Sequence, residues 1–186
     1  KESMTDFHLE VYDGNRLNTF AAMWLLQPLV LYYRLTEKRR VKELCEKIVK
    51  QHPLLHDMNF QKDCSFRGHA HTMLSGVIGL LHYGLLTEDT ALIKQCIGSY
   101  EWFVTERGST TGWCSELVED DTPIQKEDSE TCVIANLIEL AIIVAKYTGN
   151  EKYWSDAERF TKNQLMEQQL IDVDWVPFAL RRDSRN

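Results

Sequence analysis

The chain has 186 residues and a formal net charge of −7 at pH 7, with 28 acidic side chains against 21 basic ones. This acidic balance argues against a nucleic-acid partner, because phosphate binding needs clustered Lys and Arg side chains. No apolar run reaches the roughly 20 residues that a bilayer span requires, so we expect no membrane partner. The length suits one well-buried core, and we expect a single domain over residues 1–186.

The cysteine content indicates a reducing compartment. Five cysteines, an odd number and widely dispersed, lack the pattern of a disulfide framework. The sequence starts at Lys1 and carries no signal peptide. We therefore expect a cytoplasmic chain that is a processed or incomplete piece of a longer protein.

Helical periodicity dominates the sequence, with little strand signal anywhere, and the predicted helices come in pairs. The three pairs run from about Leu17–Tyr33 to Glu37–Gln51, from Gly68–Tyr83 to Glu88–Glu106, and from Glu130–Tyr147 to Glu151–Gln168. Each first helix is apolar nearly all round, as in "HTMLSGVIGLLHYG", whereas each second helix is amphipathic, as in "VKELCEKIVKQ". The first kind must be covered on both sides and the second kind on one side only.

This alternation repeats at a spacing of roughly 50 to 60 residues, which is typical of a repeat architecture. It predicts an all-α fold of helical hairpins arranged as part of an (α/α)6 toroid, in which an outer ring of helices wraps an inner ring. A plain superhelical array is the competing arrangement. A closed ring of six hairpins needs about twice as many hairpins as this sequence offers. We therefore expect the remainder of the toroid, or a partner chain, to complete the ring.

The acidic stretch from Gly108 to Ser129 is the one long loop between predicted helices. Loops of this length in a compact domain are usually functional or disordered. In a toroid, the loops that lead into the inner helices gather over one mouth, where we expect a site. Side chains with reactive groups indeed stand just before the second and third inner helices: His69, His71, Trp113, Glu116, Glu130 and Cys132.

Glu130 and Cys132 lie at a predicted helix start, where side chains at i and i+2 can converge on one ion. A carboxylate and a thiolate are both zinc ligands, and a helix N-terminus lowers the pKa of a thiol. The alternative is that Ser129 caps the helix and Cys132 packs as a small apolar residue.

The other four candidates also have two interpretations each. His69 and His71 are metal ligands or hydrogen-bond donors to a sugar; alternatively, one is exposed and the other belongs to the core. Trp113 offers a flat face on which a sugar ring stacks, or it anchors the long loop. Glu116 is a candidate general acid, or an exposed loop carboxylate.

The order of these motifs resembles glycoside hydrolase family 127. Gly68-His69 opens an apolar helix, and an aromatic-Gly-Thr-type turn, a loop glutamate and then "ETC" at residues 130–132 follow. The family comprises β-L-arabinofuranosidase-like enzymes with an (α/α)6 catalytic toroid, and the resemblance covers roughly Gly68 to Leu165. It implies a retaining glycosidase that removes terminal sugar residues from a carbohydrate substrate.

The resemblance also implies a role for particular residues. Glu130 and Cys132 would bind zinc, and Glu116 would be the general acid/base, with Glu119 as a weaker contender. His69 would line the sugar pocket. A metal-bound thiolate would replace the usual carboxylate nucleophile, and the glutamate would protonate the departing oxygen and then activate water.

The sequence departs from the family in one respect. Two adjacent cysteines further along the family's chains complete the zinc site, and one of them is the nucleophile. This sequence has no Cys-Cys pair, and no cysteine follows Cys132. Two other hypotheses therefore stand beside the first: a non-catalytic helical module that binds glycan or protein, and a metal-free enzyme in which Glu116 pairs with Asp120 or Asp121.

Overall fold

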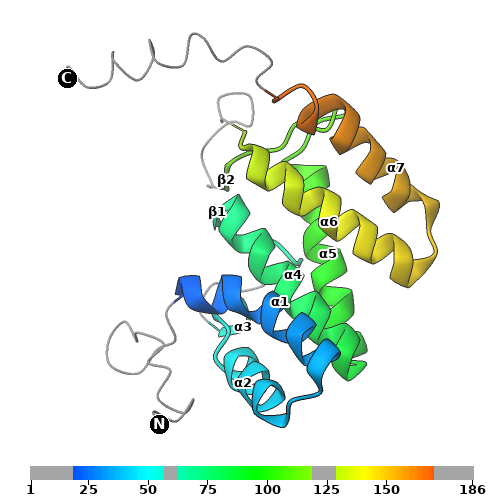
Figure 1. The fold of residues 1–186 in the computed structure, drawn as a ribbon. Coiled ribbons are helices and arrows are strands. Elements are labelled where there is room, and N and C mark those ends of the chain that lie inside the picture. Colours follow the sequence, from blue (N-terminus) through cyan, green and yellow to red (C-terminus); the bar gives the residue numbers. More distant parts are fainter. Residues whose placement is uncertain (1–18, 57–62, 119–128, 170–186) are drawn as a thin grey trace, which may run out of the picture.

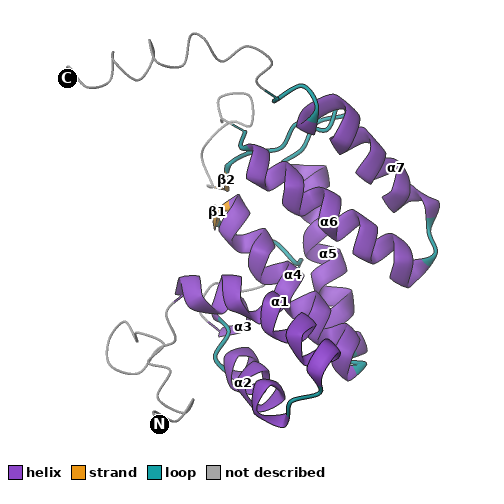
Figure 2. Ribbon diagram, in the orientation of Figure 1, coloured by secondary structure: helices purple, strands orange, loops and turns teal. Residues whose placement is uncertain are grey.

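The computed structural model describes residues 19–56, 63–118 and 129–169, which are mostly helical (Figure 1). The helices are α1 (Thr19–Thr36), α2 (Arg39–Lys50), α3 (Pro53–His56), α4 (Ala70–Thr87), α5 (Thr90–Glu106), α6 (Thr131–Thr148) and α7 (Glu151–Phe160). Figure 2 shows two short strands, β1 (Gly68–His69) and β2 (Leu117–Val118). A π-helical turn, η3 (Thr161–Leu165), follows α7.

Three helical hairpins, α1–α2, α4–α5 and α6–α7, make up the fold. In each hairpin the two helices pack against each other, and the three first helices also pack side by side in the order α1, α4, α6. Figure 1 shows α4 between α1 and α6. These three helices form the inner layer, and α2, α5 and α7 cover it from outside. The prediction of an all-α fold built from helical hairpins is confirmed.

Each hairpin turns through a two-residue link of the same form. The first link residue has a left-handed backbone in all three cases: Glu37, Glu88 and Gly149, with φ of 52°, 57° and 69°. A threonine precedes each link, and its hydroxyl donates to a carbonyl four residues back: Thr36 to Tyr32, Thr87 to Tyr83 and Thr148 to Val144. Because the links are this short, the helices of a pair run antiparallel, and all three inner helices begin at the same end of the layer.

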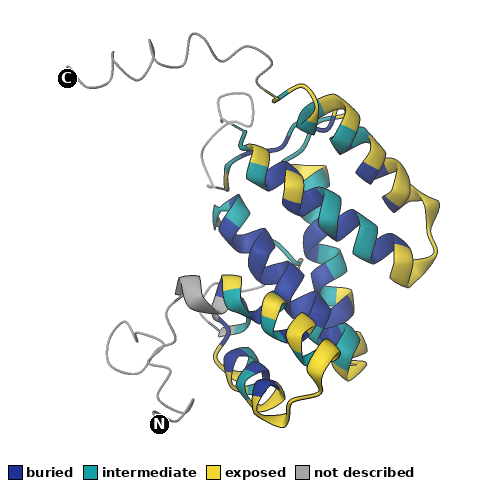
Figure 3. Cartoon of the chain, viewed as in Figure 1, coloured by how far each residue is buried: buried dark blue, intermediate teal, exposed yellow. Residues whose placement is uncertain are grey.

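Helix α4 is the centre of the core. Most of its side chains from Ala70 to Gly84 are buried, and Figure 3 shows it as a nearly continuous buried rod, whereas α1 and α6 each keep an exposed side. Glycine lets α1 approach it closely. A Cβ atom on Gly79 would lie 3.0 Å from Cβ of Leu26 and 3.2 Å from the backbone nitrogen of Gln27. A larger residue at this position would push the two inner helices apart.

Several predicted helix boundaries are wrong, since α1 ends at Thr36 rather than Tyr33 and α4 ends at Thr87 rather than Tyr83. Helix α4 begins at Ala70 rather than Gly68, because β1 pairs with β2 and Gly68 has a φ of 102°. Helix α7 ends at Phe160 rather than continuing as a regular α-helix to Gln168. The amide of Met166 donates to the carbonyl of Thr161, five residues back, over 3.1 Å, which widens the helix into η3.

Within the described residues, α6 is the one helix long and apolar enough to cross a membrane. Its contacts are those of a core helix, because it packs against both α4 and α7. Two of its polar side chains bond to the other inner helices: Asn136 donates to the carbonyl of His71, and Glu139 accepts from Gln27 over 2.6 Å. Its length and apolar character are therefore explained by burial in the inner layer.

The Gly79→Val variant tests the close approach of α1 and α4. We expect the free energy of unfolding to fall by about 1–3 kcal/mol, because the added methyl groups meet backbone and Cβ atoms that cannot rotate away. Urea denaturation followed by circular dichroism measures the change. Ala135→Val, on the exposed side of α6, is the control and should cost less than about 1 kcal/mol. Equal losses in the two variants would contradict the proposed packing.

Candidate functional site

The N-terminal ends of α4 and α6 form a common mouth, where β1 and β2 meet (Figure 1). The two strands pair antiparallel, with His69 opposite Leu117. One step further, the amide of Ala70 donates to the backbone carbonyl of Glu116 over 2.7 Å. This pairing brings the long loop back to the start of α4 and sets Glu116 beside His69.

One carboxylate oxygen, Oε2 of Glu130, is the shared acceptor of the mouth. Nε2 of His69 lies 2.9 Å from it, and the thiol of Cys132 donates to it over 3.1 Å. The other ring nitrogen of His69, Nδ1, lies 3.0 Å from the hydroxyl oxygen of Thr72. The imidazole is therefore fixed on both sides, and a proton on Nε2 would point at the carboxylate.

Glu116 completes a group of three potential metal ligands. The ligand atoms of His69, Glu116 and Glu130 all lie within 4.8 Å of one another, and all three residues are partly buried. One imidazole nitrogen and two carboxylate oxygens are donors that zinc accepts. These three residues could hold a metal ion, and the Cys132 thiol is hydrogen-bonded to one of them.

The surroundings of Cys132 keep its thiol protonated. Burial raises its pKa to about 11, and the hydrogen bond and negative charge of Glu130 add to the rise. The amides of the helix start act in the opposite direction but are outweighed, so the expected lowering of this pKa is wrong for the folded chain. The Cys132 thiol, followed by His69, in turn holds the pKa of Glu130 below its usual value. A bound cation would reverse this balance, because coordination removes the proton of a thiol.

Ser129 does not cap α6. The N-cap residue is Glu130, whose extended backbone precedes the first helical turn and whose side chain makes no capping bond. The hydroxyl of Ser129 is buried and has no hydrogen-bond partner among the described residues. The capping interpretation of this segment is therefore wrong, and the carboxylate that occupies the helix start binds His69 and Cys132 instead.

Trp24 of α1 and His71 of α4 form the part of the mouth that lies between these two helices. Their ring centroids are 4.6 Å apart in an edge-to-face arrangement, and the His71 ring is 6.1 Å from that of His69. Burial lowers the pKa of His71, and the nearby His69 lowers it further. A neutral imidazole offers one hydrogen-bond donor and one acceptor, a combination that suits a hydroxyl group.

Trp24 is the residue of the mouth that the sequence pattern did not indicate. It lies inside the first inner helix rather than in front of one, and an aromatic residue in an apolar helix is normally part of the core. In the structure 45% of its surface is exposed. Its signal in the sequence is its place in the N-terminal half of an inner helix, which begins at Thr19.

Trp113 lies apart from this group. Its backbone carbonyl accepts from the amide of Ser109 over 2.8 Å, and its own amide donates to the Ser109 hydroxyl over 3.1 Å. Within the described ranges no hydrogen bond or ring contact joins its indole to His69, Glu116 or Glu130, and a role in sugar stacking stays a prediction. The other acidic candidates of the loop lie outside the described residues: Glu119, Asp120 and Asp121.

Together, the fold and the mouth define an α/α-hairpin protein with clustered carboxylates and imidazoles at the start of its inner helices. The catalytic domain of β-L-arabinofuranosidase, GH127, matches residues 21–178, and the chain belongs to this family. The domain of the family is an (α/α)6 toroid, and the fold prediction is confirmed at this level as well. No curated protein matches the chain.

The raised pKa of Cys132 predicts slow alkylation of the metal-free chain at pH 8. Replacing Glu130 with Gln removes the negative charge that helps to raise this pKa, so the thiolate fraction and the alkylation rate should both increase. Iodoacetamide labelling followed by mass spectrometry measures the rate at each cysteine. Cys64, which is also partly exposed, is the internal reference. A slower reaction at Cys132 in the variant would contradict the assigned cause.

Metal titration tests the three-residue ligand group. Cobalt(II) added to the chelator-treated chain should bind, and Glu130→Gln should weaken binding about tenfold or more because a charged donor is lost. Calorimetry measures the affinity, and a sulfur-to-cobalt absorption band would report coordination by Cys132. Glu101→Gln, which alters a carboxylate paired with Lys152 on the outer helices, is the matched control. Equal affinity in the two variants would exclude Glu130 as a ligand.

Proposed function

We propose that the chain forms the catalytic mouth of a glycosidase that removes terminal sugar residues, of the β-L-arabinofuranosidase type, with retention of configuration. The observation that supports this most directly is the convergence of Glu116, His69 and Glu130 within 4.8 Å at the mouth. Glycosidases need a carboxyl group that can protonate a departing oxygen beside a second reactive group. The carbohydrate is thus the expected partner.

Glu116 is the general acid/base in this proposal. Its carboxyl group protonates the oxygen of the departing group while a nucleophile, which the remainder of the toroid would supply, bonds to the anomeric carbon of the sugar. The carboxylate then takes a proton from the water that displaces this nucleophile and releases the sugar. His71 donates to or accepts from the hydroxyls of the bound sugar, and His69, whose ring nitrogens face Thr72 and Glu130, lines the sugar pocket beside it. The edge-to-face contact of Trp24 with His71 supports this side of the mouth as the sugar-binding side, because exposed aromatic faces stack well on sugar rings.

Glu130 and Cys132 are the proposed metal ligands, with His69 beside them, and Glu116 stays uncoordinated in this proposal so that it can carry the proton. The donor set fits zinc in its chemistry: carboxylate, thiol and imidazole groups meet around one oxygen of Glu130. A bound zinc ion would supply positive charge that keeps thiols ionised. Metal coordination would replace the hydrogen bond that the Cys132 thiol now donates to Glu130. Cys132 is assigned as a ligand and not as the nucleophile, since the family's nucleophile belongs to a Cys-Cys pair that this sequence does not contain.

Replacing Glu116 with Gln should lower the turnover of a chromogenic β-L-arabinofuranoside by about a hundredfold or more, because proton transfer to the leaving group is lost. Steady-state hydrolysis measures this, and NMR of the first-formed anomer tests retention. Glu106→Gln, at the exposed end of α5, is the control and should keep full activity. Unchanged turnover in Glu116→Gln would remove the proposed acid. Full activity in the presence of a chelator would instead favour a mechanism that uses carboxylates alone.

A second candidate function is a non-catalytic helical module, and one feature of α1 favours it. Its exposed side carries large apolar residues in a row, Trp24, Leu31 and Leu35, of which Leu35 is 86% exposed. Such a row is typical of a surface that another polypeptide covers. The remainder of a toroid or a partner chain would fit there. The absence of glycoside hydrolysis by a protein that still binds such a partner would favour this alternative.

The state of the cysteines supports the proposed cytoplasmic location. All five are free thiols, and three of them, Cys45, Cys96 and Cys114, are buried in the hydrophobic core. Burial raises the pKa of each of these three thiols, so they are unreactive toward exchange. A reducing compartment preserves such thiols.

A further inference from the structure

The segment that leads to Glu116 is a small closed loop. Gly108 and Cys114 form an antiparallel bridge, and between them the amide of Gly112 donates to the carbonyl of Ser109 over 3.0 Å. We call residues 108–114 the tip hairpin. It follows the last turn of α5 directly, and two residues after its end stands Glu116.

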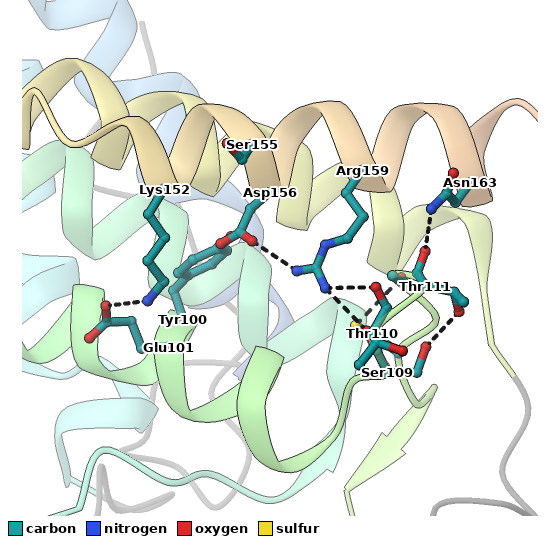
Figure 4. A network of polar contacts seen from close by, with 12 residues as sticks. Tyr100, Glu101, Ser109, Thr110, Thr111, Lys152, Ser155, Asp156, Arg159 and Asn163 are labelled. Carbon is teal, nitrogen blue, oxygen red and sulfur yellow. Dashed lines mark hydrogen bonds and ion pairs between the residues drawn. The ribbon is translucent and has the colours of Figure 1, made fainter.

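Arg159 of α7 clamps the tip hairpin from the outer layer (Figure 4). Its Nη1 donates to the backbone carbonyls of Ser109 and Thr110 over 3.3 and 3.2 Å. Its Nη2 donates to Oδ1 of Asp156 over 2.8 Å. The guanidinium therefore joins one helix to two successive carbonyls of the hairpin, a geometry that its planar fork suits and that a single ammonium group cannot reproduce.

The carboxylate that orients Arg159 is itself fixed from a second helix. Oδ2 of Asp156 accepts from the hydroxyl of Tyr100 on α5 over 2.9 Å, and both residues are buried. A further bond runs from the side chain of Asn163 to the carbonyl of Thr111 over 3.0 Å. The clamp is thus a network that starts at Tyr100 in the core and ends at the hairpin, as Figure 4 shows.

The hairpin also lies in direct contact with α7. Gly112 has a φ of 99°, and a Cβ atom at this position would meet the ring of Phe160 at 3.2 Å. Glycine is required here by the backbone conformation and by the close approach. The position of the hairpin is therefore set by α7, and not by α5 alone.

Glu116 stands between this hairpin and the strand pair. Before it, the amide of Ser115 donates to the carbonyl of Arg107 over 3.1 Å; after it, Leu117 pairs with His69. Its own carbonyl accepts from Ala70. The backbone around Glu116 is consequently fixed by residues immediately before and after it, and a shift of the hairpin on α7 is transmitted to the carboxyl group.

We propose that Arg159 is a positioning residue for Glu116: it holds the tip hairpin on α7, so that the carboxyl group meets His69 and Glu130 at the mouth. It does so without touching the substrate. This inference rests on the proposed function for its effect on turnover, but its structural effect can be measured without any turnover.

A second ion pair near the clamp supplies the control. A cavity of about 300 Å³ between α5, α7 and the hairpin is lined by both Arg159 and Lys152. Lys152 donates to Oε1 of Glu101 over 3.0 Å, so this pair joins α7 to α5. No bond from its ammonium group to the tip hairpin occurs within the described residues. Lys152→Ala therefore removes a cation from the same cavity without releasing the hairpin.

The experiment compares Arg159→Ala, Arg159→Lys and Lys152→Ala in the full chain. Hydrogen exchange of the Ala70 amide reports the position of Glu116, because that amide donates to the Glu116 carbonyl. We expect Arg159→Ala to speed this exchange about tenfold or more and to lower kcat about tenfold with KM within about twofold, since misplaced catalytic groups affect the reaction step more than binding. Arg159→Lys should fall between the wild type and Arg159→Ala, and Lys152→Ala should match the wild type.

Two results would overturn the inference: equal Ala70 exchange in Arg159→Ala and Lys152→Ala, or a loss of activity that appears in KM alone. If Arg159→Ala does not fold, Asn163→Ala decides, because it removes one exposed bond to the same hairpin and should change exchange in the same direction. A chain with no glycosidase activity would refute the proposed function, whereas the exchange of Ala70 would still test the clamp.

Discussion

The two-residue link between paired helices is the constraint on which the rest of this structure depends. A left-handed residue ends the first helix, and an extended N-cap residue starts the second at once, so the chain returns antiparallel. The same link occurs three times, and each is preceded by a threonine whose hydroxyl bonds back to the last turn. Since every turn is at one end of the layer, every inner helix must begin at the other. The mouth is a geometric result of these short turns.

At the mouth, charge and burial are balanced around a single carboxylate. Glu130 accepts from an imidazole and a thiol, which stabilises its ionised form, and its charge in turn keeps the thiol protonated. The strand pair contributes the neighbouring carboxyl group of Glu116 from the other side. The chemistry proposed here depends on such a concentration of reactive groups in a partly buried place.

The sequence pattern was sufficient for the three helical hairpins, though not for all their boundaries, because periodicity and turn residues act locally. The strand pair was not predictable, since two residues such as Gly68 and His69 carry no alternating pattern. The pKa of Cys132 was predicted with the wrong sign, because the helix N-terminus was considered without burial or the carboxylate beside it. Arg159 and Trp24 were missed for a shared reason: each acts through contacts between segments distant in sequence.

The reactive residues of the mouth come from two different helical hairpins, α4–α5 and α6–α7. The strands β1 and β2 join the open ends of the α4–α5 hairpin, so His69 and the backbone of Glu116 can come together within that unit. Glu130 and Arg159 belong to the next hairpin, and they arrive only when it docks. In a chain built from stacked repeats, each unit can form before it meets its neighbour. In an intermediate whose hairpins have formed but not docked, Glu130 would not meet His69 and Glu116. Such an intermediate would lack the proposed catalytic group, and the acid cluster would be complete only when folding has finished.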